Sequence, residues 1–204
     1  MSADQVEASC LAGPDAVYYF RKKGAGSLTM TGANTYTVGT AVDAGTLKLA
    51  SGATLPATEM WAGADATLDL NGTSQTAKEL GGTGTVKGGT LAVTDTIQPG
   101  GRKTVGTLTV DGTALTSGTL VVDIGANGAS DCLASTGALD LSGLSFALGE
   151  SSLLDEAKVY TVATAPSFTG TFAGVTLPNR KWRVSVADTK VKLVYANGTV
   201  LYFR

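Results

Sequence analysis

The chain has 204 residues, of which 43% are hydrophobic and 16% charged, and its formal net charge is −2. This length fits one domain of ordinary size, and the weak charge argues against a protein that neutralises nucleic-acid phosphates with clustered Lys and Arg. We therefore expect no nucleic-acid partner. The sequence contains no histidine, which excludes Ser-His-Asp and Cys-His catalysis and His-ligated zinc.

Residues 1–23 are expected to form an N-terminal lead-in or cap. They lack the basic start and the apolar segment of a signal peptide. The apolar segment VYYF at 17–20 would cover the first coil and is followed by Arg21, Lys22 and Lys23, which we interpret as charges that protect the edge of a strand. No apolar run in the chain approaches the ~20 residues that a membrane helix needs, so no membrane span is predicted.

Residues 24–148 repeat a short unit that reads small residue, small hydroxyl residue, apolar, polar, apolar. The unit first occurs as GSLTM at 26–30 and again as GTLKL at 45–49. Its central leucines recur at a loose interval of about 20 residues, in the range typical of solenoids; we take as markers Leu28, Leu47, Leu68, Leu91, Leu108, Leu120 and Leu139.

The two apolar residues of each unit stand at i and i+2, so in a strand they point to the same face. One unit is too short to bury that face, and stacking successive units would bury it in a shared core. We therefore predict β-solenoid repeats over residues 24–148, with the strands of Leu28 and Leu47 on adjacent coils. A β-sandwich built from hairpins is the rival fold, but it gives no reason to reuse one five-residue unit.

Residues 149–204 are expected to form a C-terminal antiparallel β cap rich in aromatic residues. Residues 150–156 read as a short helix or a polar turn, and strands are predicted at 158–162, 181–186 and 190–195. The last two flank a hairpin loop at 187–189, and Asn197-Gly198 would turn the chain into 199–203. Such a cap would cover the open strand edges at the end of the solenoid, which otherwise promote aggregation.

Residues 23–37, KGAGSLTMTGANTYT, followed by AGTL at 44–47, resemble the autotransporter-associated β-strand repeat of bacterial passenger domains. The segments 81–86, 97–100, 130–133, 160–162 and 168–172 are also similar to the later parts of such passengers. The resemblance implies an all-β, right-handed parallel β-helix at the bacterial cell surface or beyond, associated with the outer membrane through a parent protein. It further implies a piece of a longer passenger or another export route, and it transfers no catalytic residues.

Five aspartates lie beside or inside the repeated strands: Asp43, Asp69, Asp111, Asp123 and Asp140. Aligned on one flank, they could bind Ca²⁺ or supply the paired carboxylates of a glycosidase. We favour a role in turns and solvated positions, because nothing matches the closely spaced Gly and Asp of calcium-binding solenoids. No catalytic, cofactor-binding or metal-binding residue is assigned.

Two further sets of residues carry an alternative chemistry. Arg102-Lys103 and Arg180-Lys181 could supply the base of a polysaccharide lyase, but solvated loop charges explain both pairs. Trp61, Trp182 and Tyr36 could stack on a sugar ring, although packing in the core or cap is the favoured interpretation. Cys10 and Cys132 are 122 residues apart; we favour free thiols, and a single bridge between them stays open.

These observations predict an exported, non-enzymatic β-solenoid that acts as a structural spacer or adhesion module. Its expected partners are surface glycans, extracellular matrix or other copies of the chain, and no cofactor is expected. The alternative is a polysaccharide-active lyase or hydrolase on the same scaffold, which would need a cleft holding two or more carboxylates with a Lys or Arg.

Overall fold

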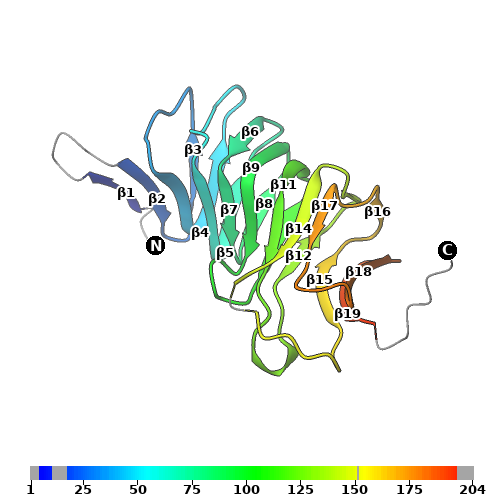
Figure 1. Cartoon of the computed structure of the whole chain (residues 1–204). Helices are drawn as coiled ribbons and strands as arrows, with labels where there is room; N and C mark the ends of the chain where they lie inside the picture. Colours follow the sequence, from blue (N-terminus) through cyan, green and yellow to red (C-terminus); the bar gives the residue numbers. More distant parts are fainter. Residues whose placement is uncertain (1–4, 11–17, 151, 197–204) are drawn as a thin grey trace.

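The chain forms a β-solenoid of about six turns in the computed structural model, which describes residues 5–10, 18–150 and 152–196. The coils are stacked in a row, with β1 (Gln5–Cys10) and β2 (Tyr18–Lys23) at one end and β18 (Trp182–Ala187) and β19 (Lys190–Tyr195) at the other (Figure 1). Each coil has three sides, and nearly all strand pairings between coils are parallel. The prediction of a β-solenoid is confirmed.

Each side of the solenoid is a ladder of parallel strands. Side one contains β2, the beginnings of β4 (Gly39–Leu49) and β5 (Glu59–Asp69), β7 (Glu79–Gly82), the ends of β9 (Thr90–Pro99) and β11 (Ala114–Val122), β14 (Leu144–Leu148) and β17 (Gly174–Thr176). Side two contains β3 (Ser27–Met30), the ends of β4 and β5, β8 (Thr85–Lys87), β10 (Thr107–Asp111), β12 (Cys132–Ser135) and β15 (Tyr160–Thr164). Side three contains β6 (Ser74–Ala77), the beginnings of β9 and β11, β13 (Leu139–Asp140) and β16 (Phe168–Thr169).

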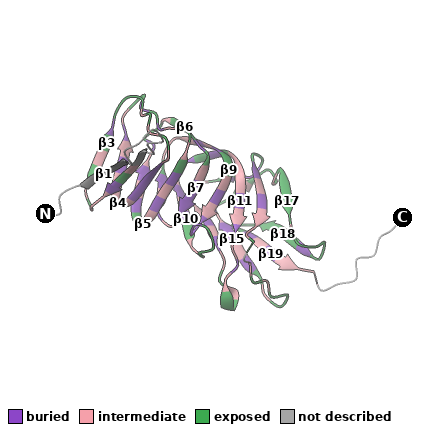
Figure 2. Cartoon of the chain, turned by 60° about the vertical axis from the view of Figure 1, so that its left-hand side comes forward, coloured by how far each residue is buried: buried purple, intermediate pink, exposed green. Residues whose placement is uncertain are grey.

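Alternation along the strands builds the core. In the second half of β5, Ala66 and Leu68 are buried while the residues beside them are partly exposed, as a strand with one buried face requires. Figure 2 shows the same alternation of buried and more exposed positions along most strands. One hydrophobic cluster runs from Met30 to Leu193, so the whole stack shares a single interior.

The register confirms the equivalence of the first repeats and corrects the later ones. Leu28 pairs with Leu47, and Leu47 with Leu68. The next members of this column are Val86 and then Val110. The expected markers Leu91, Leu108, Leu120 and Leu139 lie elsewhere: Leu108 is one inward position away on side two, Leu120 is on side one, and the other two are on side three. The five-residue unit therefore specifies a strand with one apolar face, and it does not specify a side.

Polar groups inside the stack are hydrogen-bonded. The Gln75 side chain accepts a bond from the Leu55 amide at 2.9 Å and donates to the Ala53 carbonyl at 2.9 Å. Lys22, expected as an edge charge, is fully buried instead, and its Nζ donates to the carbonyls of Lys23, Gly24 and Ala44. Within the described residues, no buried side-chain nitrogen or oxygen lacks a partner.

The C-terminal end closes the stack with an antiparallel hairpin. β19 pairs antiparallel with both β15 and β18, and Asp188, with φ of 48°, lies in the tight turn between β18 and β19. Trp182 contacts Tyr160 and Tyr195, with ring centroids 6.1 and 5.1 Å away. The predicted aromatic cap and its hairpin loop are confirmed, while Asn197-Gly198 and 199–203 lie outside the described residues.

Segments between the strands contain little helix. The described residues hold one 3₁₀ turn, η1 (Ala126–Gly128), and no helix among them is long and apolar enough to cross a membrane. Residues 150–156, expected as a helix or a polar turn, form no helix where the structure describes them. At the other end, β2 pairs parallel with β4 and antiparallel with β1, so residues 18–23 belong to the first coil.

Candidate functional site: a groove on side one

Side one carries a groove that crosses several coils on the outside of the solenoid. Its main hollow has a volume of about 320 Å³ and is lined by residues of β5, β7, β9 and the loop that follows β9: Glu59, Met60, Trp61, Glu79, Leu80, Gly81, Gln98, Gly101 and Arg102. A second hollow of about 280 Å³ shares Glu79, Gln98 and Arg102 and continues to Asp123 and Glu150. The two hollows are therefore parts of one groove.

The strand register produces this lining. Met60 and Leu80 are paired neighbours and point inward, which turns Glu59 and Trp61 of β5, and Glu79 and Gly81 of β7, outward. Glu59 pairs with Glu79, and Trp61 with Gly81. The two residues of each pair are 20 positions apart in sequence, because they occupy equivalent positions on adjacent coils.

Trp61 lies against two glycines. A Cβ atom added to Gly81 would stand 3.1 Å from the six-membered ring of the Trp61 indole, and one added to Gly101 would overlap the same ring. The ring is only partly buried and lines the groove. Because Gly81 and Gly101 have no side chains, the flat ring of Trp61 can lie against them.

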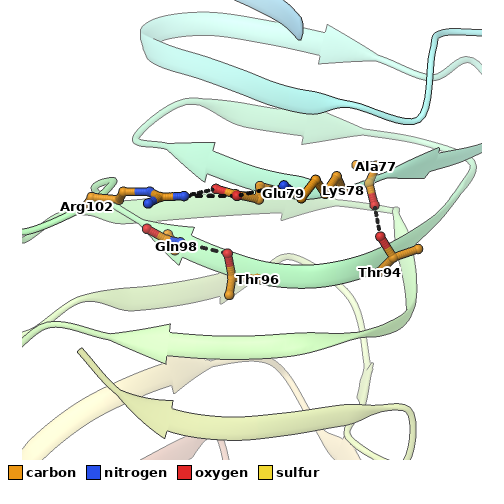
Figure 3. Close-up of polar contacts among 7 residues, drawn as sticks. All are labelled: Ala77, Lys78, Glu79, Thr94, Thr96, Gln98 and Arg102. Carbon is orange, nitrogen blue, oxygen red and sulfur yellow. Dashed lines mark hydrogen bonds and ion pairs between the residues drawn. The ribbon is translucent and has the colours of Figure 1, made fainter. Parts of the chain in front are cut away.

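Beside Trp61, the groove contains a fixed ion pair. Arg102 Nη2 donates to both carboxylate oxygens of Glu79, Oε1 at 2.9 Å and Oε2 at 2.7 Å. Figure 3 shows the two side chains pointing toward each other. Glu79 is 14% exposed and Arg102 is 70% exposed. Hydrogen bonding to Glu79 raises the pKa of the Arg102 guanidinium above its usual value. The two contacts therefore hold both charges in place.

Amide and hydroxyl groups line the next part of the groove. The Gln98 amide nitrogen donates to Thr96 Oγ1 at 2.7 Å, and both side chains lie next to the Arg102–Glu79 pair in Figure 3. Thr96 and Gln98 are partly exposed and line the second hollow. They offer hydrogen-bonding groups to a ligand in the groove.

The five candidate aspartates do not converge on one site. Asp43 forms an ion pair with Arg21 at 2.6 Å, and Asp111 accepts a hydrogen bond from Thr136 at 2.6 Å. Asp69 and Asp140 accept bonds from backbone amides two residues later, which is a turn geometry. Asp123 lines the second hollow and accepts from the Lys103 amide. No group of three or more metal-ligating side chains occurs in the part of the chain that the structure describes.

A further aspartate, which was not a candidate on sequence grounds, has a raised pKa. Asp131 is 1% exposed and accepts hydrogen bonds from the amides of Gly106 and Asp123 at 2.8 and 2.9 Å. Burial raises its pKa to about 6, against the effect of the two amides. The side chain joins two loops of neighbouring coils, so its role is structural.

The remaining candidates occupy different places. Trp182 is buried in the cap, as expected for packing. Tyr36 is partly buried, stacks on Phe20 with centroids 5.7 Å apart, and hydrogen-bonds to Thr40. Arg180 and Lys181 are exposed beside the cap. The Cys132 thiol is free and partly buried, whereas the Cys10 side chain is outside the description.

Sequence reasoning missed the groove, although it named Trp61 and Arg102 separately. The lining residues come from five coils, and their relation becomes visible only when residues about 20 apart are compared. The signal was present in the pairs Glu59 with Glu79 and Trp61 with Gly81.

Comparison with protein families identifies a known repeat in the first coils. The passenger-associated-transport-repeat matches residues 20–49, which run from within β2 to the last residue of β4. Comparison with curated proteins gives no match. The repeat and the β-solenoid together fit an autotransporter passenger domain, as the resemblance predicted, and this family suggests a surface or secreted location.

Proposed function

We propose that this chain is a passenger segment that serves as a stiff spacer and an adhesive surface. The observation that carries the proposal is the single hydrophobic cluster from Met30 to Leu193, enclosed by parallel ladders on three sides. Bending the stack would require neighbouring strands to separate and this core to open. A continuous core of this kind therefore favours a rod that holds its outer faces in fixed positions.

A non-enzymatic role is part of the proposal. The groove does gather carboxylates with a basic side chain, which is the feature an enzyme on this scaffold would need. However, the Glu79 carboxylate and the Arg102 guanidinium neutralise each other through two contacts. This pairing supports a binding surface over a general acid or base.

An adhesion assay tests the proposal. Beads carrying the covalently attached chain are passed over collagen, fibronectin, glycan-bearing epithelial cells and the immobilised chain itself. We expect shear-resistant attachment to at least one surface, and none for beads carrying heat-unfolded chain. Equal attachment of both bead types would contradict an adhesive role, and new reducing ends after incubation with polysaccharides would favour the enzyme.

A further inference from the structure

The groove on side one has the features of a saccharide site. Carbohydrate rings present apolar C–H faces and a rim of hydroxyl groups, so they bind where an aromatic surface adjoins hydrogen-bonding side chains. In this groove, Trp61 supplies the aromatic surface, and Glu59, Thr96 and Gln98 supply the polar groups. All are partly or fully exposed, and they come from the coils of β5 and β9, with the coil of β7 between them.

The shape of the groove suits a chain of sugars better than a single sugar. The two hollows are joined through Glu79, Gln98 and Arg102 and together run from Trp61 to Glu150. Successive coils are about 4.8 Å apart, which is comparable to the length that one pyranose unit adds to an oligosaccharide. Outward side chains on neighbouring coils can therefore contact neighbouring sugar units.

The charges of the groove select between classes of saccharide. Its lining includes five carboxylates but two cationic side chains: Glu59, Glu79, Asp95, Asp123 and Glu150 against Arg102 and Lys103. One of these cations, Arg102, is already paired with Glu79. The excess of negative charge repels uronic-acid polymers, the substrates of polysaccharide lyases, and leaves uncharged glycans favoured.

We propose that the groove binds an uncharged oligosaccharide, with Trp61 stacked on one sugar ring and Gln98, Thr96 and Glu59 as hydrogen-bonding partners. This inference rests on the proposed adhesive function and names the ligand class of that surface. The Arg102–Glu79 ion pair forms one fixed wall of the site. Glycine at 81 and 101 suits this arrangement, because a Cβ atom at 101 would overlap the Trp61 ring and one at 81 would press against it.

Binding of defined oligosaccharides to the purified chain tests the proposal. The probes are maltohexaose, cellohexaose and the hexamer of N-acetylglucosamine, with hexagalacturonate as the acidic comparison. Isothermal titration calorimetry gives affinity. The fluorescence of Trp61 is followed in a Trp182→Phe background, because Trp182 is the other tryptophan of the chain.

Two substitutions at one position separate stacking from folding. Trp61→Phe keeps an aromatic ring, whereas Trp61→Leu keeps an apolar side chain without one. We expect at least one neutral hexamer to bind wild type, to bind Trp61→Phe within a few-fold, and to bind Trp61→Leu about tenfold more weakly. Thr116→Ala, at an exposed position of side three, is the matched control and should bind like wild type.

Three outcomes would overturn the inference: no neutral hexamer binds at millimolar concentration, Trp61→Leu binds as well as wild type, or hexagalacturonate binds best. Far-ultraviolet circular dichroism identifies any Trp61 variant that has not folded. In that case, Trp61 fluorescence in the Trp182→Phe chain, whose groove is unaltered, decides whether a hexamer binds at this tryptophan. The bead assay separates the two proposals. Wild-type beads that attach without any hexamer binding retain the adhesive function and exclude this ligand, whereas beads that never attach exclude the adhesive function.

Discussion

In the coils between β3 and β10, the interior is filled by aliphatic side chains in register, such as Leu47, Leu68 and Val86. Between β15 and β19 it is filled by the rings of Tyr160 and Trp182, and the strands become antiparallel. A coil in the middle has a neighbour on both sides, so small side chains suffice to bury it. The last coil has a neighbouring coil on one side only. On its other side, the antiparallel β18–β19 hairpin and its aromatic side chains take the place of a further coil.

The largest expected effect tests this difference at the cap. Trp182→Ala removes a buried ring from between Tyr160 and Tyr195 and should lower the free energy of unfolding by about 3–5 kcal/mol. Because each coil contacts only its neighbours, hydrogen exchange should accelerate in β15, β18 and β19 first.

Leu68→Ala is the matched substitution in the middle of the stack, with an expected cost of about 2–5 kcal/mol. Its faster exchange should appear in β4, β5 and β8 and should spare the cap. If either variant loses protection uniformly along the whole chain, the two regions are one cooperative unit and the comparison fails.

A second test examines how tightly the regular coils are stacked. Gly82 has φ of 114°, and a Cβ atom there would overlap the carbonyl oxygen of Ala62 on the preceding coil. Gly82→Ala should therefore cost about 3 kcal/mol or more. Gly52, with φ of 76° and open space around it, is the control, and Gly52→Ala should cost only about 1 kcal/mol in urea unfolding. Equal losses of stability in the two variants would show that the close approach of Gly82 to Ala62 does not determine the effect of the substitution.

The third test concerns Asp131, which lies where the regular coils give way to longer loops. Its pKa is raised to about 6 in the folded state from an ordinary value of 3.8. The folded chain therefore retains a proton that the unfolded chain has released, so this group lowers stability as pH rises from about 4 to about 6. The loss is at most about 3 kcal/mol.

Unfolding in urea at pH 4, 5, 6 and 7 measures this effect. Asp131→Asn, which keeps a carbonyl oxygen as acceptor, should show a flatter profile than wild type over this range. A wild-type profile that rises with pH, with the variant unchanged, would mean that the two amide donors outweigh burial.

The smallest expected effect lies on the outer surface. Arg102→Gln removes the ion pair with Glu79, and because the Arg102 side chain is largely exposed to solvent, this pair should contribute little to stability. Thermal unfolding should change little, and the remaining difference should shrink in high salt. A loss as large as that of Leu68→Ala would mean that the groove wall supports the coils.

The sequence predicted the class of fold well, because an apolar pair at i and i+2 that recurs every 20 residues has few ways to be buried. The column from Leu28 to Leu68 and the hairpin around Asp188 follow directly from local pattern. The sequence did not predict which side of the solenoid each strand occupies. Leu91 and Leu120 carry the same local motif as Leu47, and the lengths of the loops before them differ. Loop length changes the side a strand occupies without changing its own residues.

The groove was less predictable for a related reason. Trp61 and Arg102 are separated by 41 positions, and their proximity depends on the register of two intervening strand pairings, β5 with β7 and β7 with β9. Lys22 was wrongly predicted from its local sequence. A lysine beside Arg21 and Lys23 reads as exposed, yet its position in β2 turns it inward, where backbone carbonyls surround its ammonium group.

The matching register of Leu28, Leu47 and Leu68 has a consequence for how such a protein can change its length. Each of these coils presents nearly the same outline above and below, so one coil can serve as a template for an additional one. Duplicating residues 47–67 would insert a complete winding whose upper and lower surfaces already match their new neighbours. The molecule would grow by one strand spacing, about 4.8 Å, while both of its ends stay as they are.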